Sequence, residues 1–416
     1  MENNDFFPIV LGSDENAYGT ARLFYEKYGI KPLLLCTRTL VPTCYSKILE
    51  IKHIDNFDSA DIFKTELKKT LLSLKDRYKK LIVIPCSDYY AELTVSTYDF
   101  YDGMIANRFI SKSLFDRVDT KDSFYDLCRE CGLDFPKTVI VKPDDRVSVI
   151  DSLGFDFPIV IKPENSNSTD YLHCSFEGKK KAYFFKSREE YLSCINEMNK
   201  TDYKGLLIIQ EFIPGDDTAM RVVNSYSDMS GKVRFSCIGH VLLEEYAPNL
   251  IGNYAAIITE KDEALYSKVI SFLNRIGYVG FSNLDVKYDR RTGRYMMFEL
   301  NPRLGRSSFF MYSAGHNAME YLVDDVIYGK PFSLEKGEKE AIWASVPGSV
   351  IRQHVDEKEL KDKADRLIKE NGLLHTLRYK KDNSIKRRLK IERYYLGQKR
   401  SFKKYFFRKN FDDKTR

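Results

Sequence analysis

The stretch from Gly280 to Ser308, GFSNLDVKYDRRTGRYMMFELNPRLGRSS, combines acids, amides and arginines in a pattern suited to a metal ion and a phosphate group. Apolar runs at 281–288 and 294–300 flank a turn-forming segment, which predicts a β-hairpin. Side chains alternate between the two faces of a strand, so we expect these polar residues on one face: Asn283, Asp285, Glu299 and Asn301. Such a hairpin would place Asp285 and Glu299 diagonally, roughly 7–8 Å apart at Cα.

The hairpin predicts a magnesium site. Mg²⁺ prefers hard oxygen ligands and usually takes one or two carboxylates, while phosphate and water complete its octahedron. We therefore interpret Asp285, Glu299 and Asn301 as candidate metal ligands, and Arg303 and Arg306 as phosphate contacts beside them. The alternative is the solvated face of an ordinary hairpin, because Asp and Arg are common on exposed strands.

Two further segments point to a nucleotide. Lys162 ends the apolar run FPIVIK, where burying an ammonium group is costly unless an anion meets it, so we interpret it as a phosphate ligand. The alternative is a lysine that extends from the strand end into solvent. The segment QEFIPGDD, residues 210–217, leaves a strand for a turn, which frees backbone groups to contact a purine edge and places an acid nearby for ribose hydroxyls.

The elements that must position these residues follow an alternating order in the first third of the chain. Apolar runs at 7–11, 32–36, 48–51 and 81–85 alternate with helical segments, which predicts an open parallel α/β sheet. Ligands of such sheets bind beyond the carboxyl ends of the strands, which here are Gly12–Asp14 and Ser87–Asp88. Plain turns and helix caps are the alternative for both segments.

Composition places the protein among globular chains of two or three domains. It has 416 residues, of which 43% are hydrophobic and 30% charged, and it contains no apolar run long enough for a membrane span. The acidic start predicts no signal peptide, and eight cysteines without a paired framework fit a reducing cytoplasm. Cys128 and Cys131 form the only C-x-x-C, inside a helical pattern, so we expect no metal or redox role for them.

Positive charge is concentrated in the tail at 385–416, which has 13 Lys and Arg against three acids, whereas the whole chain has a net charge of +6. Aromatic residues are interleaved with these cations. Such a tail can be solvated, pack onto the body, attract an acidic precursor or rest on an anionic membrane surface. Nothing resembles a nucleic-acid-reading module, so we expect no nucleic-acid partner.

The order Lys121, Lys162, polar loop, QEFIPGDD and then D-x13-E-x-N resembles the ATP-grasp superfamily from about Thr120 to Lys330. These enzymes make acyl phosphates from a carboxylate and ATP, and an amine captures the acyl group. ELNPRLGRSS is similar to the carbamoyl-phosphate-synthase form of the motif. The resemblance implies an α/β fold with an N-terminal open domain at 1–118, an ATP-grasp region at 119–335 with a small lid subdomain at about 137–212, and an extension at 336–416.

The same resemblance assigns roles residue by residue. Lys162, Arg303 and Arg306 look like the catalytic cations, and Mg²⁺, or Mn²⁺ in its place, would bind Asp285, Glu299 and Asn301. The implied ATP-binding residues are Lys121, Lys162, Lys181, Gln210, Glu211, Phe212, Ile213 and Asp217. The implied substrate contacts are Arg306, Ser307, Ser308, Asn283 and Arg221, with a surface role as the alternative for Arg221. His240 and Asn253 are weaker candidates near the acceptor, since a lone histidine is more often structural.

Further motifs narrow the resemblance to the D-aspartate ligases of Gram-positive peptidoglycan synthesis: LGSDENAYGTAR, VPTCYSKI, FEGKKKAYFF, QEFIPGDD, GRSSFF and SIKRRL. That family implies a cytoplasmic enzyme that phosphorylates the β-carboxylate of D-aspartate and joins it to the ε-amino group of the stem-peptide lysine. Its partners would be an amino-acid donor and a muropeptide or nucleotide-linked precursor. The alternatives are a ligase for another amino acid and amine, or a nucleotide-binding scaffold without turnover. Polar residues 165–169 do not all match the family.

Overall fold

The protein is described from a computed structural model, which places residues 5–164, 171, 173–176, 179–180, 182–248, 250–331 and 333–407. The described chain divides into two compact units. The first comprises the described residues of Met1–Asp119, Asp216–Val286 and Leu300–Asn410, and the second those of Thr120–Gly215 and Lys287–Glu299.

The first unit begins with the expected parallel sheet. Its four strands are β1 (Phe6–Leu11), β2 (Leu33–Cys36), β3 (Glu50–His53) and β4 (Lys80–Pro85), in the order β3-β2-β1-β4. The helices that alternate with and follow these strands are α1 (Glu15–Tyr28), α2 (Ala60–Leu74), α3 (Asp88–Ser96) and α4 (Lys112–Asp119). β1 and β4 form because β1, and β4 after its exposed first residue Lys80, are apolar runs that are buried in the sheet.

A seven-stranded sheet carries the predicted hairpin. Its strands are β9 (Met220–Ser227), β10 (Val233–Glu244), β11 (Tyr254–Glu260), β12 (Gly280–Asp289), β13 (Arg294–Asn301), β14 (Glu335–Lys336) and β15 (Ile342–Ala344). The order is β13-β12-β9-β10-β11-β15, and β14 pairs with β10. The hairpin turns where the amides of Thr292 and Gly293 donate to the carbonyl of Asp289.

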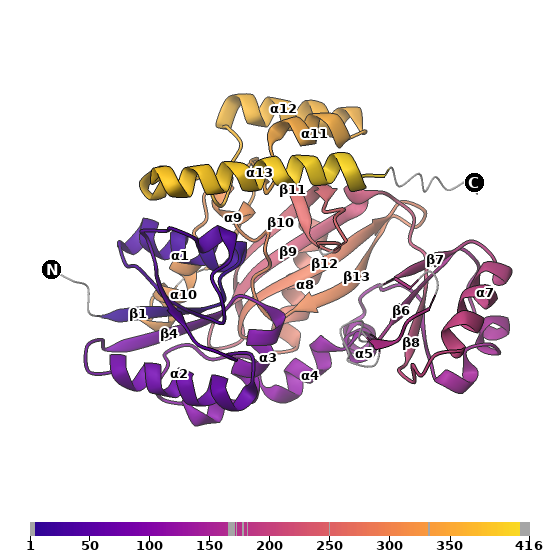
Figure 1. Cartoon of the computed structure of the whole chain (residues 1–416), viewed down its shortest axis with the longest axis horizontal. Coiled ribbons are helices and arrows are strands. Elements are labelled where there is room, and N and C mark those ends of the chain that lie inside the picture. Colours follow the sequence, from indigo (N-terminus) through magenta and orange to yellow (C-terminus); the bar gives the residue numbers. More distant parts are fainter. Residues whose placement is uncertain are drawn as a thin grey trace. The chain divides into compact units, whose positions relative to one another are not determined.

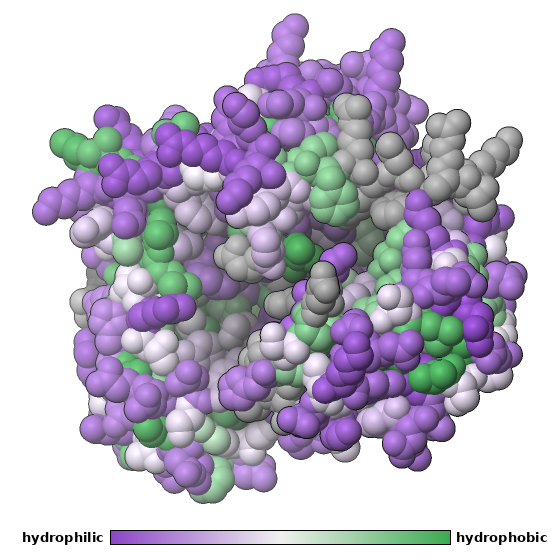
Figure 2. All heavy atoms as spheres, turned by 45° about the vertical axis from the view of Figure 1, so that its right-hand side comes forward, coloured by the Kyte–Doolittle hydropathy of each residue, from purple (hydrophilic) through white to green (hydrophobic). Residues whose placement is uncertain are grey.

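Helices of the first unit cover its sheets and form its C-terminal part. They are α8 (Glu263–Arg275), α9 (Phe310–Ser313), α10 (Ala318–Val326), α11 (Gly348–His354), α12 (Lys358–Asn371) and α13 (Ile385–Tyr405). Figure 1 shows α11, α12 and α13 gathered beyond the β10 and β11 end of the large sheet. The surface over α11 and α12, at the top of Figure 2, is mostly hydrophilic.

The second unit contains an antiparallel sheet in the order β5-β8-β6-β7. Its elements are α5 (Lys121–Cys131), β5 (Thr138–Val141), β6 (Ile159–Pro163), β7 (Tyr183–Phe185), α7 (Arg188–Asn199) and β8 (Leu207–Glu211). Ser187 caps α7, since its Oγ accepts from the Glu190 amide, and the Glu190 carboxylate accepts from the Lys186 amide just before the helix. Short 3₁₀ turns lie at Val41–Thr43, Tyr98–Phe100, Pro143–Asp145, Val149–Ser152, Asp217–Ala219 and Lys380–Asp382.

Two features of the C-terminal region carry no clear signal in the sequence. Glu335 and Lys336 form β14 and pair with Phe235 and Ser236 of β10. The basic tail is a helix as far as Tyr405, and it packs onto the body through buried residues that include Ile391, Tyr395 and Phe402. Of the arrangements considered for the tail, the described part therefore adopts the self-packed one. No helix among the described residues has the length and apolarity needed to cross a bilayer.

Candidate active site

The carboxyl ends of β1 and β4 lie beside the loop that follows β13. Asn16 on α1 donates to the carbonyls of Cys86 (3.0 Å) and Leu304 (2.6 Å), and so ties the ends of both strands to that loop. Asp88 at the start of α3 forms an ion pair with Arg303 at 2.6 Å. Asp14 and Ser87 also cap α1 and α3, as the alternative interpretation of these segments held. The two strand-end segments therefore act as helix caps and also lie next to the predicted arginine loop.

Asp285 lies in a polar group with Asn301 and Asn283 in the first unit. Its Oδ1 accepts a hydrogen bond from Tyr254 (2.8 Å) and its Oδ2 one from the Asn301 amide (3.3 Å). Asn301 also donates to Asn283 Oδ1 (3.2 Å), and its own Oδ1 accepts from Arg303 (3.2 Å). These contacts orient the Asn301 side chain, whose oxygen faces the Arg303 guanidinium, and Asp285 is half-buried.

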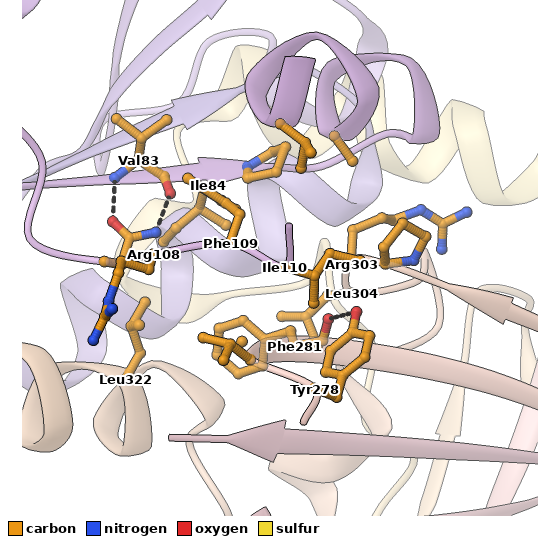
Figure 3. A pocket seen from close by; sticks show the side chains of 17 residues that line it. Val83, Ile84, Arg108, Phe109, Ile110, Tyr278, Phe281, Arg303, Leu304 and Leu322 are labelled. Atoms are coloured by element: carbon orange, nitrogen blue, oxygen red, sulfur yellow. Dashed lines mark hydrogen bonds between the residues drawn. The ribbon is translucent and has the colours of Figure 1, made fainter. Parts of the chain in front are cut away.

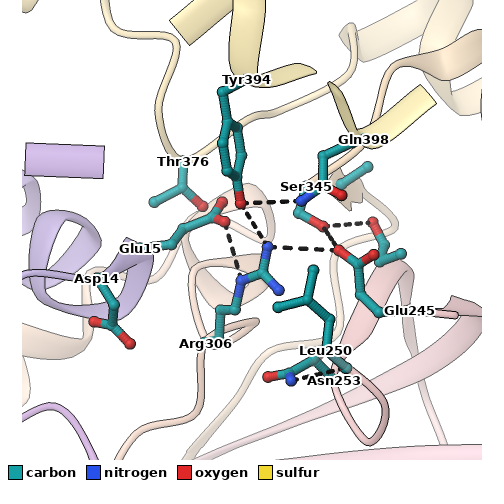
Figure 4. A network of polar contacts seen from close by, with 12 residues as sticks. Asp14, Glu15, Glu245, Leu250, Asn253, Arg306, Ser345, Thr376, Tyr394 and Gln398 are labelled. Carbon is teal, nitrogen blue, oxygen red and sulfur yellow. Dashed lines mark hydrogen bonds and ion pairs between the residues drawn. The ribbon is translucent and has the colours of Figure 1, made fainter. Parts of the chain in front are cut away.

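Arg306 is the centre of a buried polar cluster that joins α1, the residue that follows β10, the loop after β13 and α13 (Figure 4). Its Nε lies 3.2 Å from Glu15 Oε2, and its Nη2 lies 3.5 Å from Glu245 Oε1 and 2.8 Å from the Tyr394 hydroxyl. Gln398 donates to the same hydroxyl at 3.1 Å. We call Glu15, Glu245, Arg306 and Tyr394 the Arg306 cluster.

Burial and charge act in opposite directions on the acids of the Arg306 cluster. Burial raises the pKa of Glu15 and of Glu245, and the Arg306 charge only partly offsets it. Burial alone would lower the pKa of Arg306, but the charges of Glu15, Tyr394 and Glu245 outweigh it and raise that pKa well above the ordinary value. Burial also raises the pKa of Tyr394 to about 12. Arg306 is thus a permanent cation with two carboxyl groups against it.

Ser307 and Ser308 are buried where the loop enters α9, and backbone bonds from Ser308 to Gly305 and from Phe310 to Ser307 form the turn. Gly305 packs closely against Asn283, because a Cβ atom at this position would lie 2.9 Å from Asn283 Nδ2 and the Asn283 side chain would have to shift. The turn therefore holds the arginines close to the Asn283 side of the sheet.

In the second unit, Lys121 and Glu299 form an ion pair, with Nζ 3.7 Å from Oε2. Tyr125, one turn along α5, donates to the Phe298 carbonyl and accepts from Gln210 Nε2 at 2.8 Å. Helix α5 is thereby tied to strands β13 and β8. Lys162 lies on β6 opposite Ile208 of β8 and is half-buried.

The predicted adenine hinge follows β8. The amide of Glu211 donates to the Lys137 carbonyl and its carboxylate accepts from the Lys137 amide, while the Phe212 amide donates to Pro158. Glu211 and Phe212 also line a polar hollow of about 530 Å³ with Lys137 and residues 150–158. Gln210 and Ile213 are buried.

Three other sequence candidates have structural partners. Asp217 is buried, and its carboxylate accepts from the Glu244 amide (2.8 Å) and the Tyr246 hydroxyl. Arg221 is buried and paired with Glu260, so its alternative surface role is wrong. Burial raises the pKa of Glu260, but His240 and Arg221 outweigh it and hold that pKa at about 2. The ring nitrogens of His240 contact the Glu260 carboxylate and the Thr218 carbonyl, as expected for a structural histidine.

An apolar cavity of about 40 Å³ lies in the first unit beneath Arg303 (Figure 3). Side chains from β4, from residues 107–110 and from residues 278–281 surround it, and Asn107 closes one side through paired hydrogen bonds to Val83. A cavity of this size holds no more than a water or two. It is therefore a packing space rather than a substrate site.

The residue types of the predicted metal ligands, Asp285, Glu299 and Asn301, are ones that bind hard cations. Asp285 and Asn301, in the first unit, offer a carboxylate and an amide oxygen, and Glu299, in the second unit, offers a further carboxylate. Within the described ranges, no group of three or more His, Cys, Asp and Glu residues is arranged to hold a metal by itself. Lys181, the predicted loop lysine, lies outside the described residues.

Sequence reasoning missed three members of the Arg306 cluster. Glu15 lies inside one of the recognised motifs, LGSDENAYGTAR, which was the available signal. Tyr394 was counted with the aromatic residues of the tail, and Glu245 carries no local signal that distinguishes it from a surface acid. Packing of four distant segments, rather than spacing in the sequence, brings them together.

Comparison with known proteins gives one relative that spans the chain. The chain is 40% identical over 414 residues to the D-aspartate ligase of Enterococcus faecium (strain Aus0004), covering 98% of each. Among solved structures it is similar to an L-amino acid ligase from Bacillus licheniformis, with a TM-score of 0.54, 14% identity and coverage of 80% of this chain and 76% of that one. It is also similar to the biotin carboxylase domain of the Hydrogenobacter thermophilus 2-oxoglutarate carboxylase in complex with MgADP, ADP and bicarbonate, with a TM-score of 0.58, 14% identity and coverage of 80% and 73%. No protein-family model matches the chain.

Proposed function

The chain belongs to the D-aspartate ligases, and from this premise we propose that it phosphorylates the β-carboxylate of D-aspartate and joins it to the ε-amino group of lysine in a peptidoglycan stem-peptide precursor. The resemblance stated from the motifs is thus confirmed, and so is the ATP-grasp fold. The MgADP in the 2-oxoglutarate carboxylase structure supports our proposal that this chain uses ATP with Mg²⁺. The protein is an ATP-dependent carboxylate–amine ligase. The identity of 40% over nearly the whole length is the observation that carries the finer proposal.

Phosphorylation provides the leaving group that a carboxylate lacks. Phosphoryl transfer passes through a state of spread negative charge, so a protein catalyses it mainly by positioning groups and supplying cations. In our proposal Lys121, Lys162 and Arg303 balance that charge, and Arg306 holds a carboxylate of the donor. ADP and phosphate leave, and the amide forms when the lysine amine attacks the acyl phosphate.

We assign Asp285, Glu299 and Asn301 to the metal and the hinge from Gln210 to Ile213 to adenine. Bound Mg²⁺ would supply charge neutralisation at the terminal phosphates, and Mn²⁺ accepts the same oxygen ligands. The contact between Lys121 and Glu299 supports this assignment, because a lysine beside a metal acid lies where phosphate charge must be balanced. Asp217 remains our ribose candidate, and a sugar hydroxyl would share its carboxylate with Tyr246. Ser307, Ser308, Asn283 and Arg221 remain the other proposed substrate-side residues.

The test is ADP release with D-aspartate and a nucleotide-linked muropeptide, run beside L-aspartate and other amino acids. Glu299→Gln and Lys162→Ala should each reduce ADP release by at least about 10²-fold, the typical worth of one charge-stabilising group. Glu197→Gln is the matched control, since Glu197 is another half-exposed acid of the second unit paired with a lysine. Wild-type rates in both site variants would remove the site assignment, and release with a different donor or amine would select the alternative ligase.

We also propose that the enzyme works in the cytoplasm at the inner face of the membrane, through α13. Ile385, Leu389 and Leu396 are 74%, 64% and 56% exposed, and their spacing places them on one side of the helix. Exposed cations flank them: Lys386, Arg388, Lys390, Arg393, Lys399, Arg400, Lys403 and Lys404. An anionic surface attracts each nearby cation by about 1 kcal/mol.

Deletion of the helix is unsuitable as a test, because its other face belongs to the core. Leu389→Glu combined with Leu396→Glu alters only exposed positions and should abolish co-sedimentation with phosphatidylglycerol vesicles. Lys358→Glu with Lys369→Glu, at exposed positions of α12, is the control. Equal pelleting of wild type and the α13 variant would refute membrane contact.

A further inference from the structure

Three buried atoms of the Arg306 cluster make no hydrogen bond of good geometry to a described residue: Glu15 Oε1, Glu245 Oε2 and Arg306 Nη1. The Thr376 hydroxyl nevertheless lies close enough to Glu15 to lower the pKa of its carboxyl group. Each of the three atoms belongs to a side chain whose other atoms are engaged within the cluster, through Arg306 Nε and Nη2. Glu15 and Glu245 are 2% and 3% exposed. Buried polar atoms are rarely left unpaired, because each costs the full desolvation of that group.

The unpaired atoms are complementary in kind. Two are carboxylate oxygens, which accept hydrogen bonds from a cation, and one is a guanidinium nitrogen, which donates to an anion. A lysine side chain offers only an ammonium group, and a phosphate offers only acceptors. The head group of an α-amino acid offers an ammonium and a carboxylate on one carbon, so it satisfies both kinds at once.

We propose that the Arg306 cluster binds the α-amino-acid head group of the donor, with its ammonium on Glu15 and Glu245 and its α-carboxylate on Arg306. This deepens the proposed function and rests on it for the identity of the donor. The side-chain carboxylate is then the only one left for phosphorylation, which selects the β-carboxyl group of an aspartate. Three separate contacts around the α-carbon also distinguish the two enantiomers, because the mirror image cannot satisfy all three.

Tyr394 and Gln398 act as positioning residues. The Tyr394 hydroxyl lies 2.8 Å from Arg306 Nη2 and accepts from Gln398, so it holds that nitrogen away from the ligand side. Ser345 similarly donates to Glu245 Oε1 at 3.3 Å, which leaves Oε2 as the oxygen available to the ammonium. Figure 4 shows Arg306 between the two acids, with Tyr394 on the α13 side.

The test is calorimetric binding to the full chain with ADP and Mg²⁺, so that no turnover is required. Three ligands form a matched series: D-aspartate, succinate, which lacks the ammonium, and β-alanine, which lacks the α-carboxylate. Wild type should bind D-aspartate more tightly than either analogue and more tightly than L-aspartate. Glu15→Gln and Glu245→Gln should each raise the Kd for D-aspartate at least tenfold, yet leave the Kd for succinate unchanged or lower.

The positioning role predicts a different pattern. Tyr394→Phe should raise the Kd for D-aspartate and for succinate but leave that for β-alanine unchanged, because only the carboxylate contact is disturbed. Asp325→Asn is the control: it removes an acid of the same unit that accepts from Tyr226 and lies outside the cluster, and it should bind like wild type.

Equal increases for D-aspartate and succinate in Glu15→Gln and Glu245→Gln would overturn the proposal, since they indicate general distortion. Absence of amino-acid binding in wild type would overturn it as well. If D-aspartate binds with the expected pattern but no amide forms, the proposed function fails and the head-group site stands. If the amide forms but Glu15→Gln and Glu245→Gln both bind D-aspartate with unchanged affinity, the head-group site fails and the proposed function stands.

Discussion

A buried ion pair between Asp382 and Arg387 lies where the C-terminal helix meets the N-terminal sheet region. Removing the Asp382 charge and removing the Arg387 charge should lower the free energy of unfolding by different amounts. Arg387 Nε lies 2.9 Å from Asp382 Oδ2, and both side chains are almost wholly buried. Asp382 also accepts from Tyr18 (3.0 Å), Ser46 (2.7 Å) and the Lys47 amide (2.7 Å). Arg387 otherwise has one hydrogen bond, to the Cys44 carbonyl, and the ring of Tyr18.

Asp382→Asn leaves a buried guanidinium with little compensation, and loss of one partner of a buried pair typically costs about 3–5 kcal/mol. Arg387→Met leaves a carboxylate that keeps three donors, so we expect a smaller loss, about 1–3 kcal/mol. The double variant should lose less than the sum, with a coupling of about 0.5–3 kcal/mol.

Urea unfolding followed by tryptophan fluorescence measures these losses, because the single tryptophan, Trp343, is buried in the first unit with this pair. Circular dichroism of each variant before unfolding checks that it is folded. Either of two results would refute the reasoning: Arg387→Met costing as much as Asp382→Asn, or losses that simply add. The first would mean that the three donors do not compensate Asp382, and the second that the pair is not coupled.

Three further predictions concern acid stability, packing and the metal. Burial lowers the pKa of His375 to about 4 from 6.5, so the unfolded chain binds more protons between those values and stability falls as the pH drops through that window. His375→Asn should therefore reduce the fall in Tm between pH 7 and pH 5, a contribution of about 2 kcal/mol at pH 5; an unchanged fall would contradict it. Gly239→Ala should cost about 1–3 kcal/mol in urea unfolding, since overpacking of a filled core has that cost. The added Cβ atom would lie 2.7 Å from Ile257 Cγ2. An unchanged free energy of unfolding would contradict this prediction, because it would show that the core adjusts to the extra methyl group. Removal of divalent cations by EDTA should abolish ADP release and Mg²⁺ should restore it, whereas persistent release would exclude the metal assignment.

Elements with a local signal could be predicted from the sequence. β1 and β4 are continuous apolar runs, and α1 begins at its cap Asp14 and ends at Gly29, whose φ of 68° favours glycine. The hairpin was predicted because turn residues separate two apolar runs. In each case neighbouring residues contain the information that sets the structure.

Other elements depend on partners far along the chain. β14 is a charged dipeptide that becomes a strand only because β10 offers it an edge, and nothing in Glu335–Lys336 indicates this. The interpretation of the α13 sequence relied on its positive charge and did not predict its buried face. The spacing of Ile391, Tyr395 and Phe402 nevertheless places them on one side of a helix. The site divides in the same way. Asp285 and Asn301 follow from strand alternation, whereas Glu245 joins Arg306 only through tertiary packing.

The participation of α13 in the Arg306 cluster has a consequence for biosynthesis. Arg306 and Glu15 are translated long before Tyr394, so a nascent chain holds an incompletely supported guanidinium until the final helix leaves the ribosome. Tyr18, Ser46 and Lys47 are likewise translated long before Asp382, to which they donate hydrogen bonds. A polypeptide that ended before this helix would contain the segments that we assign to the nucleotide, but would lack Tyr394 from the site that we propose for the donor. The proposed donor site can therefore be complete only after α13 has been synthesised.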